Sequence, residues 1–403
     1  MKEMKTNKWT HGLVAAGIVS LGSVAQAEEA AVSMVETALP STTLSGYVDT
    51  SAIWKFGSGN ANMPGRTYDG PDVQDGFNLN VVSLTLEKPL DESQWSAGYT
   101  VQLLLGPGAT KRGTRSLVGG GGDISFNEAV ILLGLPVGNG INLKVGQFGT
   151  YNGYEAYDTY KNPNWSRSYG FFIESSAHTG ISASYAFNDM VSLTAGIGNA
   201  AAFNNAVDAR QAYESRKAYL GILSFTAPES FGAFSGAGLS VGYTVGDRQL
   251  DASGRSSLGA PAGGSRWSQG NFYVGGSLPM PIEGLSLGFA YDYTHGQTAP
   301  SDYANATALY VNYQMDKWTF NNRFDYASGT AGVFDGVGTP GSTDRLFSYT
   351  LTVDYALWAN VISRAEFRWD HSLSGDRPYG GTVAGTPRDK NAVSLGMNVI
   401  YQF

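Results

Sequence analysis

The segment 146–180 contains the clearest set of residues that could act on a solute. Glu155, Asp158 and Glu174 are spaced among eight aromatic residues, which are Tyr151, Tyr154, Tyr157, Tyr160, Trp165, Tyr169, Phe171 and Phe172. The tip of an exposed loop is normally small and polar, so this many rings should pack against another part of the protein. We therefore predict that a loop at about 150–176 folds inward, where its carboxylates would line a narrowed passage.

Four basic residues at inward positions of predicted strands could face these carboxylates. They are Lys144, Arg323, Arg364 and Arg368. Opposite charges across a narrow, wet passage create a transverse field, and rings of charge set ion selectivity. The alternative is that the two signs pair locally and tether the loop. The sequence leaves both interpretations open, and the acidic balance of the chain favours a mild preference for cations.

The histidines of the mature chain, His178, His295 and His371, lack the spacing of a metal site. His178 with Ser182 or Ser184 is the one local combination of a base with a nucleophile, and it is a weak basis for a hydrolase. We predict no catalytic residues, no metal and no cofactor.

Asp69, Asp72 and Asp75 could offer carboxylate oxygens to calcium. Their spacing is not that of the twelve-residue EF-hand loop. A solvated acidic loop is the preferred interpretation, and calcium binding stays open. The glycine run 119–122 lacks the Lys-Ser/Thr of a phosphate-binding loop, which indicates a flexible tip.

The elements that would position these residues show an apolar–polar alternation with a period of two, which is typical of β-strands. In the last thirteen residues Val393, Leu395, Met397 and Tyr401 share one face, and the other face is small or polar except at Ile400. We predict about sixteen strands, at 43–56, 77–88, 95–105, 124–135, 141–149, 177–187, 190–198, 216–226, 238–246, 271–278, 285–294, 305–314, 317–327, 345–356, 359–370 and 391–403.

The gaps between these strands alternate in length. Long gaps follow the odd strands and short gaps follow the even ones, with one long even gap at 227–237. Long loops at one end and tight turns at the other, with an even number of strands, are typical of an antiparallel β-barrel of the outer membrane. About sixteen strands enclose a water-filled lumen, whereas about eight would be filled by their own side chains.

The strand at 359–370 tests which side chains of this barrel point into the lumen and which point to lipid. Arg364, Glu366, Arg368 and Asp370 alternate with apolar residues. An Arg or Lys facing lipid at mid-depth costs roughly 2–4 kcal/mol, so these charges should point into a wet lumen.

Aromatic residues also lie near the ends of predicted strands, where amphipathic rings favour the headgroup boundary of a membrane. They are Trp54, Phe56, Tyr291, Tyr293, Trp318, Trp369, Tyr401 and Phe403. The alternative is the general preference of aromatic residues for strands.

The amino terminus has the pattern of a signal peptide at 1–27. Lysines at 2, 5 and 8 precede an apolar stretch at 12–24 and an A-x-A cleavage site at 25–27, and the stretch is too short to span a bilayer. A short periplasmic segment at 28–42 would precede the barrel at 43–403. The mature chain would then have 23 basic and 33 acidic residues and no cysteine, which disfavours nucleic acid as a partner.

Several segments resemble the beta-barrel porin type 2 (OmpL-like) family of Gram-negative outer-membrane porins. They are G-Q-F-G-T-Y-N-G-Y-E at 146–155, N-P-N-W-S-R-S-Y at 162–169 and H-T-G-I-S-A-S-Y at 178–185, with L-T-L-E-K-P-L-D-E at 84–92 and L-S-G-Y-V-D-T at 44–50. The resemblance implies a channel for passive diffusion of ions and small hydrophilic solutes, in contact with outer-membrane lipid. A homotrimer would follow by analogy with general porins.

Three alternatives to a general porin remain open. The first is a substrate-selective channel, for example for sugars, in which the loop aromatics form a stacking track. The second is a non-conducting structural or adhesion barrel. The third is an enzyme of the outer membrane, which the sequence favours least.

Overall fold

The structure is a computed structural model of the 403-residue chain. It describes residues 35–36, 41–67, 69–91, 95–112, 123–201, 210–211, 216–247, 249–250, 268–296, 302–330, 333–334 and 345–403. The predicted signal peptide at 1–27 lies outside the described residues, as does most of the predicted segment at 28–42.

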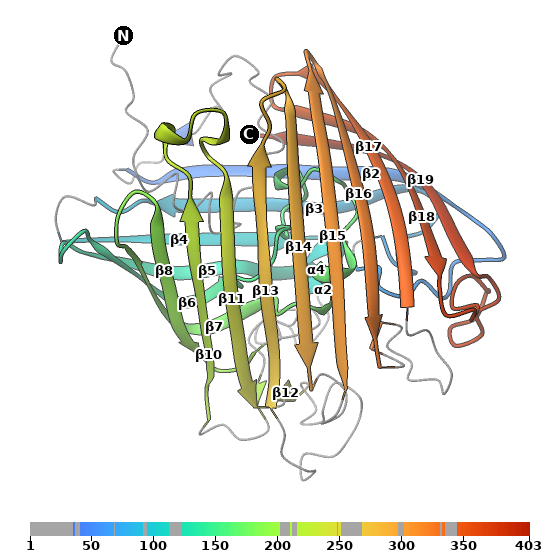
Figure 1. Ribbon diagram of the computed structural model, residues 1–403, viewed down its shortest axis with the longest axis horizontal. Helices are drawn as coiled ribbons and strands as arrows, with labels where there is room; N and C mark the ends of the chain where they lie inside the picture. Colours follow the sequence, from blue (N-terminus) through green and yellow to red (C-terminus); the bar gives the residue numbers. More distant parts are fainter. Residues whose placement is uncertain are drawn as a thin grey trace.

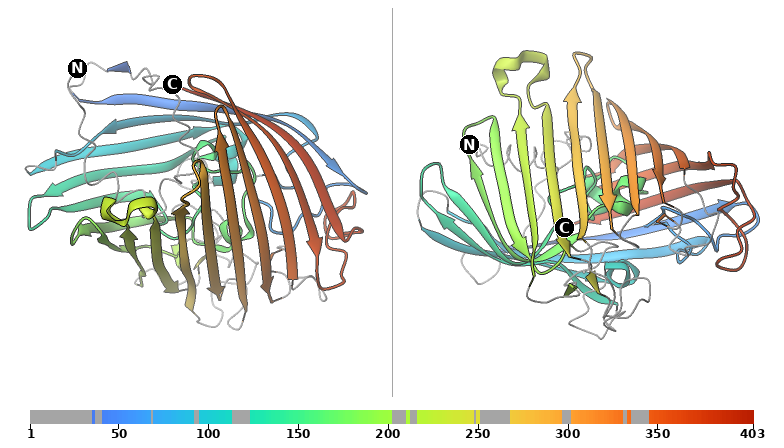
Figure 2. Two further views of the ribbon diagram at one scale, coloured as in Figure 1. Left: turned by 45° about the horizontal axis from the view of Figure 1, so that its top comes forward. Right: turned by 60° about the horizontal axis from the view of Figure 1, so that its bottom comes forward.

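Sixteen strands form one closed antiparallel barrel (Figures 1 and 2). In chain order they are β2 (Thr43–Phe56), β3 (Gly76–Lys88), β4 (Ser96–Leu105), β5 (Ile124–Leu135), β6 (Ile141–Gly149), β7 (Ala177–Ala186), β8 (Val191–Gly198), β10 (Ala218–Thr226), β11 (Gly238–Asp247), β13 (Ser268–Pro279), β14 (Leu285–His295), β15 (Tyr303–Met315), β16 (Trp318–Gly329), β17 (Arg345–Trp358), β18 (Val361–Ser372) and β19 (Asn391–Gln402). Each strand pairs with the next, and β19 pairs with β2. The prediction of about sixteen strands is confirmed, and no predicted boundary is wrong by more than three residues.

The remaining elements are short. β1 (Val35–Glu36) pairs with the start of β2, and β9 (Arg210–Gln211) pairs with β12 (Gln249–Leu250). The helical turns are α2 (Pro107–Arg112), η1 (Thr159–Lys161), α4 (Tyr169–Ile173) and η2 (Glu229–Phe234). Among the described residues, no helix has both the length and the apolar character needed to cross a bilayer.

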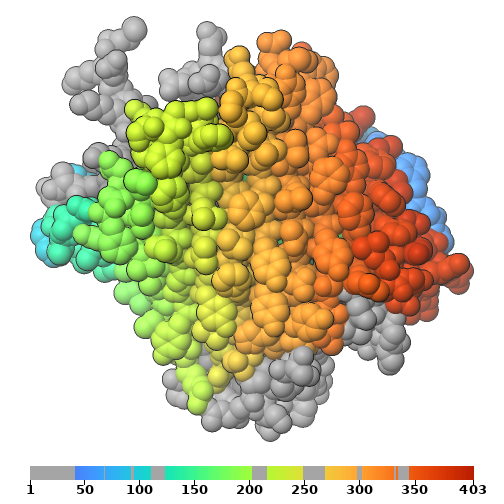
Figure 3. Space-filling model, viewed as in Figure 1, coloured from blue at the N-terminus to red at the C-terminus, as the bar shows by residue number. Residues whose placement is uncertain are grey.

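The two faces of the sheet separate apolar from polar side chains as the alternation predicts. On β19 the side chains of Met397 and Tyr401 are 59% and 50% exposed on the outer face, whereas Ser394 and Asn398 are buried inside. Ile400, the exception in the sequence pattern, is also buried inside. The outer face of β10 to β18 forms a continuous surface (Figure 3), which is the surface that a barrel presents to lipid.

Hydrogen bonds between side chains join the first and last strands inside the barrel. The Asp49 carboxylate on β2 accepts from Asn80 of β3 at 2.8 Å and from Asn398 of β19 at 2.5 Å. The same Asn398 amide donates to the carbonyl of Thr50 at 2.9 Å. These bonds supplement the backbone ladder where the barrel closes.

Two of the tight turns depend on a left-handed residue. Asp316, between β15 and β16, has a φ of 51°, and Asn360, between β17 and β18, has a φ of 65°. Asp and Asn tolerate this conformation better than other residues with a Cβ. They permit the short connections at one end of the barrel, while the long connections lie at the other end.

Candidate functional site

The connection between β6 and β7, residues 150–176, lies inside the ring of strands, and we call it the inner loop (Figures 1 and 2). Four of its aromatic side chains are buried: Tyr151, Tyr157, Trp165 and Tyr169. Its helix α4 packs against β14, β15 and β16. These four of the eight aromatic residues that the sequence singled out therefore contact the inner wall of the barrel.

Arg323 of β16 joins the inner loop to the wall. Its guanidinium is fully buried and donates to Oε1 of Glu155 at 2.9 Å and to the carbonyl of Ser166 at 2.8 Å. It also donates to the carbonyl of Arg167 at 3.1 Å and pairs with Asp325 on its own strand at 2.8 Å. Charge-assisted hydrogen bonds of this kind are about twice as strong as neutral ones, so Arg323 is a firm anchor.

The charges of β18 hold the other half of the loop. Arg364 donates to the carbonyls of Thr159 at 3.0 Å and Asn162 at 2.8 Å. Arg368 donates to the carbonyl of Arg167 at 2.7 Å. All of these groups point inward, as the cost of placing a charge in lipid requires.

Glu366, between these two arginines on β18, accepts from the loop. Its carboxylate receives the backbone N–H groups of Trp165 at 2.7 Å and Ser166 at 3.1 Å. Both signs of charge on β18 therefore bind backbone groups of the inner loop that would otherwise be unpaired in the lumen.

Aromatic side chains complete the anchoring. Tyr154 stacks on Tyr310 with ring centroids 4.3 Å apart, and the Tyr169 hydroxyl donates to Asp370 at 2.7 Å. The Trp165 indole lies against Gly396 of β19, where a Cβ would stand 3.0 Å from the ring. A larger residue at 396 would push the indole away from the wall.

The connection between β2 and β3, residues 57–75, also contacts the inner wall of the barrel, and it corrects one prediction. Arg66 pairs with Asp69 and with Asp370 of β18, and Asp69 is buried. Burial alone would raise the pKa of the Asp69 carboxyl, but the charges of Arg66 and then Arg368 outweigh it and lower that pKa. The prediction of a solvated acidic loop is therefore wrong for Asp69, because its ion pair with Arg66 keeps it inside the barrel.

The opposite side of the inner loop faces open space. A cavity of about 130 Å³ lies between the loop and strands β4 and β5. Its charged lining residues are Glu128, Glu155, Asp158, Lys161 and Glu174, four acidic and one basic. The amides of Gln102 and Asn127 also line it, so this space is suited to water and ions.

Two ion pairs border this cavity and remain partly accessible. Lys144 of β6 pairs with Glu128 of β5 at 2.8 Å, with side chains 30% and 22% exposed. Lys161 pairs with Asp158 at 2.8 Å within the inner loop. Burial would raise the pKa of the Asp158 carboxyl, but Lys161 and the hydrogen bond from Tyr47 lower it.

The residues predicted for the constriction thus fall into two groups. Glu155, Asp158 and Glu174 line the cavity, and Lys144 borders it through Glu128. Arg323, Arg364 and Arg368 do not line it and lie buried between the loop and the wall.

Sequence reasoning missed Glu128, Lys161 and Arg66. Lys161 stands three residues after Asp158, and the two side chains meet across one helical turn, η1. That spacing was the available signal for Lys161. Glu128 alternates with the outward residues Ala129 and Ile131 of β5, a signal that one strand offers only weakly. Arg66 stands three residues before Asp69 and had the same local signal for that pair, but its second partner, Asp370, is 304 residues away and had none.

The histidine and serine candidates on β7 are not arranged as base and nucleophile. Nδ1 of His178 lies 3.1 Å from the carbonyl oxygen of Ala200. The Ser182 hydroxyl pairs with Tyr151 at 2.6 Å, and the Ser184 hydroxyl pairs with Thr194 at 2.7 Å. Within the described parts of the chain, no group of three or more His, Asp or Glu side chains is placed to hold a metal ion.

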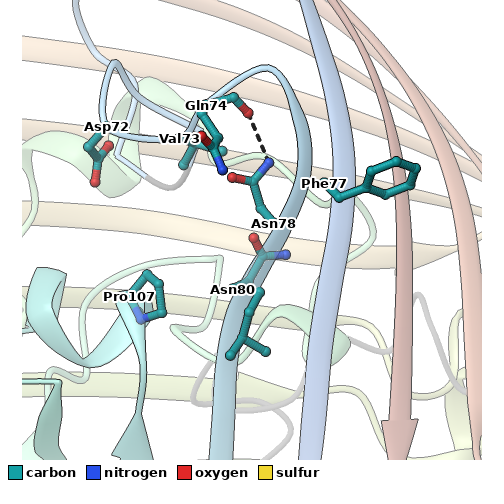
Figure 4. Close-up of a pocket in the computed structure, with 9 residues that line it drawn as sticks. Asp72, Val73, Gln74, Phe77, Asn78, Asn80 and Pro107 are labelled. Carbon is teal, nitrogen blue, oxygen red and sulfur yellow. Dashed lines mark hydrogen bonds between the residues drawn. The ribbon is translucent and has the colours of Figure 1, made fainter.

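A second cavity, of about 350 Å³, lies beside the first long connection (Figure 4). Asp72, Gln74, Asn78 and Asn80 give it a polar lining, and Asn78 donates to the carbonyl of Gln74 at 2.9 Å. Phe77 of β3 points away from these polar groups in Figure 4 and is exposed on the outer side. This cavity shares no lining residue with the charged cavity beside the inner loop.

Comparisons with known proteins agree with this architecture. Residues 41–403 match the family described as "Putative beta-barrel porin-2, OmpL-like". No curated protein sequence matches the chain.

Similar solved structures include three outer-membrane proteins. The outer membrane channel DcaP of Acinetobacter baumannii has 11% identity and a TM-score of 0.57, with 90% of this chain and 97% of that chain covered. The anion-selective porin from Comamonas acidovorans has 11% identity and a TM-score of 0.58, with 90% and 99% covered. The trimer form of OmpT from Vibrio cholerae has 12% identity and a TM-score of 0.54, with 90% and 99% covered. At these identities the likeness is one of fold.

Proposed function

The chain belongs to the OmpL-like beta-barrel porin-2 family and is an outer-membrane porin; from this premise we propose a path for its solutes. Ions and small hydrophilic solutes pass through the barrel on one side of the inner loop, between the loop and strands β4 to β6. They move down their own concentration gradients.

The observation that carries this path is the contrast between the two sides of the inner loop. On one side, Arg323 and Arg368 are buried and bonded to loop carbonyls, which leaves no room for a solute. On the other side, Glu128, Lys144 and Lys161 keep part of their surface accessible beside a cavity. A wet passage needs charged groups that water can reach.

The same contrast supports a mild preference for cations. Carboxylates outnumber ammonium groups in the cavity lining, and the guanidinium groups of Arg323, Arg364 and Arg368 are taken up by the loop. Rings of carboxylates favour cations in a narrow aqueous pore.

A sugar-selective channel is the weaker candidate. A stacking track needs rings that a passing sugar can touch, but Trp165 and Tyr169 are buried against the wall and do not line the cavity. Tyr154 is stacked on Tyr310. These aromatic residues support the loop instead.

The proposal extends to assembly and export. OmpT of Vibrio cholerae has a trimer form, and we expect a homotrimer of this chain in the outer membrane of a Gram-negative bacterium. We expect export through a signal peptide at 1–27. A passive channel needs no catalytic residue and no cofactor.

Planar-bilayer recording of the purified, folded barrel tests this function. We expect stable, ohmic current steps in potassium chloride and a reversal potential of cation-preferring sign in a salt gradient. The absence of steps from barrel that is folded by its gel mobility would favour the structural or adhesion barrel. A saturable block by one sugar would favour the selective channel.

A further inference from the structure

We propose that Glu174 is the cation-binding group of the constriction, and that a small monovalent cation, an alkali ion or a protonated primary amine, rests at its carboxylate during passage. This inference rests on the proposed path beside the inner loop. It assigns the selectivity to one residue of the three acidic residues that line the cavity from the loop.

The first step is the pairing of the other carboxylates. Glu155 pairs with Arg323 at 2.9 Å, Asp158 with Lys161 at 2.8 Å, and Glu128 with Lys144 at 2.8 Å. Each of these acids therefore already has a basic partner.

Glu174 differs from these three acids. It is 5% exposed and lines the same cavity. Within the part of the chain that the structure describes, its carboxylate has neither a hydrogen bond nor an ion pair. A buried carboxylate without a partner is costly, and it is stabilised by taking up a cation or a proton.

The second step is the fixed position of this carboxylate. Glu174 caps the carboxyl end of α4, where its backbone N–H donates to the carbonyl of Gly170 at 3.0 Å. The carboxylate lies over Gly153, which has a φ of 118°, and a Cβ there would stand 2.5 Å from Oε2. Glycine at 153 thus provides both the backbone conformation and the space for the carboxylate beside the cavity.

The third step concerns the charges that act on Glu174. Burial has the largest effect on its pKa, followed by the negative charges of Asp292 on β14 and Glu155, and all three raise that pKa well above its ordinary value. Arg167 opposes them with the smallest effect. Above the raised pKa the carboxylate is charged and attracts a cation, and below it the group holds a proton and the attraction is lost.

The size and composition of the cavity point to a monovalent ion. Its volume of about 130 Å³ exceeds the roughly 30 Å³ share of one water molecule, so an ion fits with part of its hydration shell. Among the described residues, no three carboxylate or histidine groups converge to chelate a metal ion. A single anionic group with hydrated surroundings matches potassium or methylammonium.

The test compares Glu174→Gln with the wild type in the full-length folded barrel. Reversal potentials are measured in gradients of potassium chloride and of methylammonium chloride, at about pH 9 and at about pH 5. We expect the wild type to lose cation preference at the lower pH. Glu174→Gln should show a several-fold lower cation-to-anion permeability ratio at the higher pH and little change between the two.

Two further variants serve as controls. Glu229→Gln removes the same charge from the exposed turn η2 and should leave both ratios as in the wild type. Glu174→Asp keeps the charge and should retain a pH-dependent preference.

A Glu174→Gln channel with wild-type selectivity at both pH values would overturn this inference while leaving the porin function intact. A wild-type reversal potential that does not change with pH would overturn it too, and that measurement does not depend on whether a variant folds. A wild-type barrel that carries no current would instead contradict the proposed function.

Discussion

Two walls of the barrel carry similar charged side chains and use them differently. On β16 and β18, Arg323, Arg364 and Arg368 are buried and bind carbonyl groups of the inner loop. On β5 and β6, Glu128 and Lys144 pair with each other and stay partly accessible to the lumen. The difference shows that an inward charge becomes structural when loop backbone covers it, and remains available to a solute when nothing does.

Breaking the anchoring wall should have the largest effect. Arg323→Ala removes the partner of Glu155 and Asp325 and leaves both carboxylates buried without their counter-charge. Loss of one partner of a buried ion pair costs about 3–5 kcal/mol, so we expect a lower temperature for the gel-mobility shift of the unfolding barrel and noisy, enlarged current steps.

Arg216→Ala is the matched control for that change. Arg216 pairs with Asp247 at 3.3 Å with its side chain 52% exposed. An exposed pair contributes about 0–1 kcal/mol. Equal losses of stability in the two variants would remove the distinction between the walls.

A substitution of Asp158, which lies between the anchoring wall and the cavity, should cause an intermediate loss of stability. Asp158 accepts from Tyr47 at 2.9 Å on the wall side and from Lys161 at 2.8 Å beside the cavity. Asp158→Asn should cost about 1–3 kcal/mol through the weakened buried bonds. It also removes the negative charge that faces the Lys161 ammonium, so the reversal potential should move towards anion preference.

Asp316→Asn provides the comparison for this variant. Asp316 occupies an exposed tight turn with a φ of 51°, which Asn also adopts. We expect no change in reversal potential there. An unchanged reversal potential in Asp158→Asn would place Lys161 outside the path of the ions.

The smallest change in stability should come from the lumen wall itself. Lys144→Met breaks a pair whose members are partly exposed, and we expect a loss within about 1 kcal/mol. Selectivity should nevertheless move towards cations, because Glu128 then faces the passage alone. Glu128→Gln should move it the other way, and the double variant should return close to the wild type.

The barrel could be predicted from the sequence because its pattern is local. Lipid outside and water inside impose alternation on every strand, and this is visible on β19 residue by residue. The inward course of the loop also had a local signal, since residues such as Tyr154 and Trp165 are too apolar for an exposed tip.

The pairing of charges could not be predicted, because it depends on contacts distant in the sequence. Arg323 and Glu155 are 168 residues apart, and two of the acceptors of Arg323 are backbone carbonyls, which every residue carries. A register shift between Gln102 and Leu103 on β4 also breaks the simple alternation where Asn127 and Glu128 of β5 face the cavity. The sequence therefore left the anchoring and the solute-facing roles of the charged residues undecided.

The side-chain bonds around Asp49 have a consequence for biosynthesis. Asn398 of β19 donates to the carboxylate of Asp49 on β2, which lies 349 positions earlier in the chain. The ribosome therefore synthesises β2 long before β19. Until β19 arrives, β2 and β18 each expose an unpaired row of N–H and C=O groups that can recruit foreign strands. The polypeptide must therefore be kept apart from other unfolded chains during export. A truncated product that lacks β19 should aggregate rather than insert into the membrane.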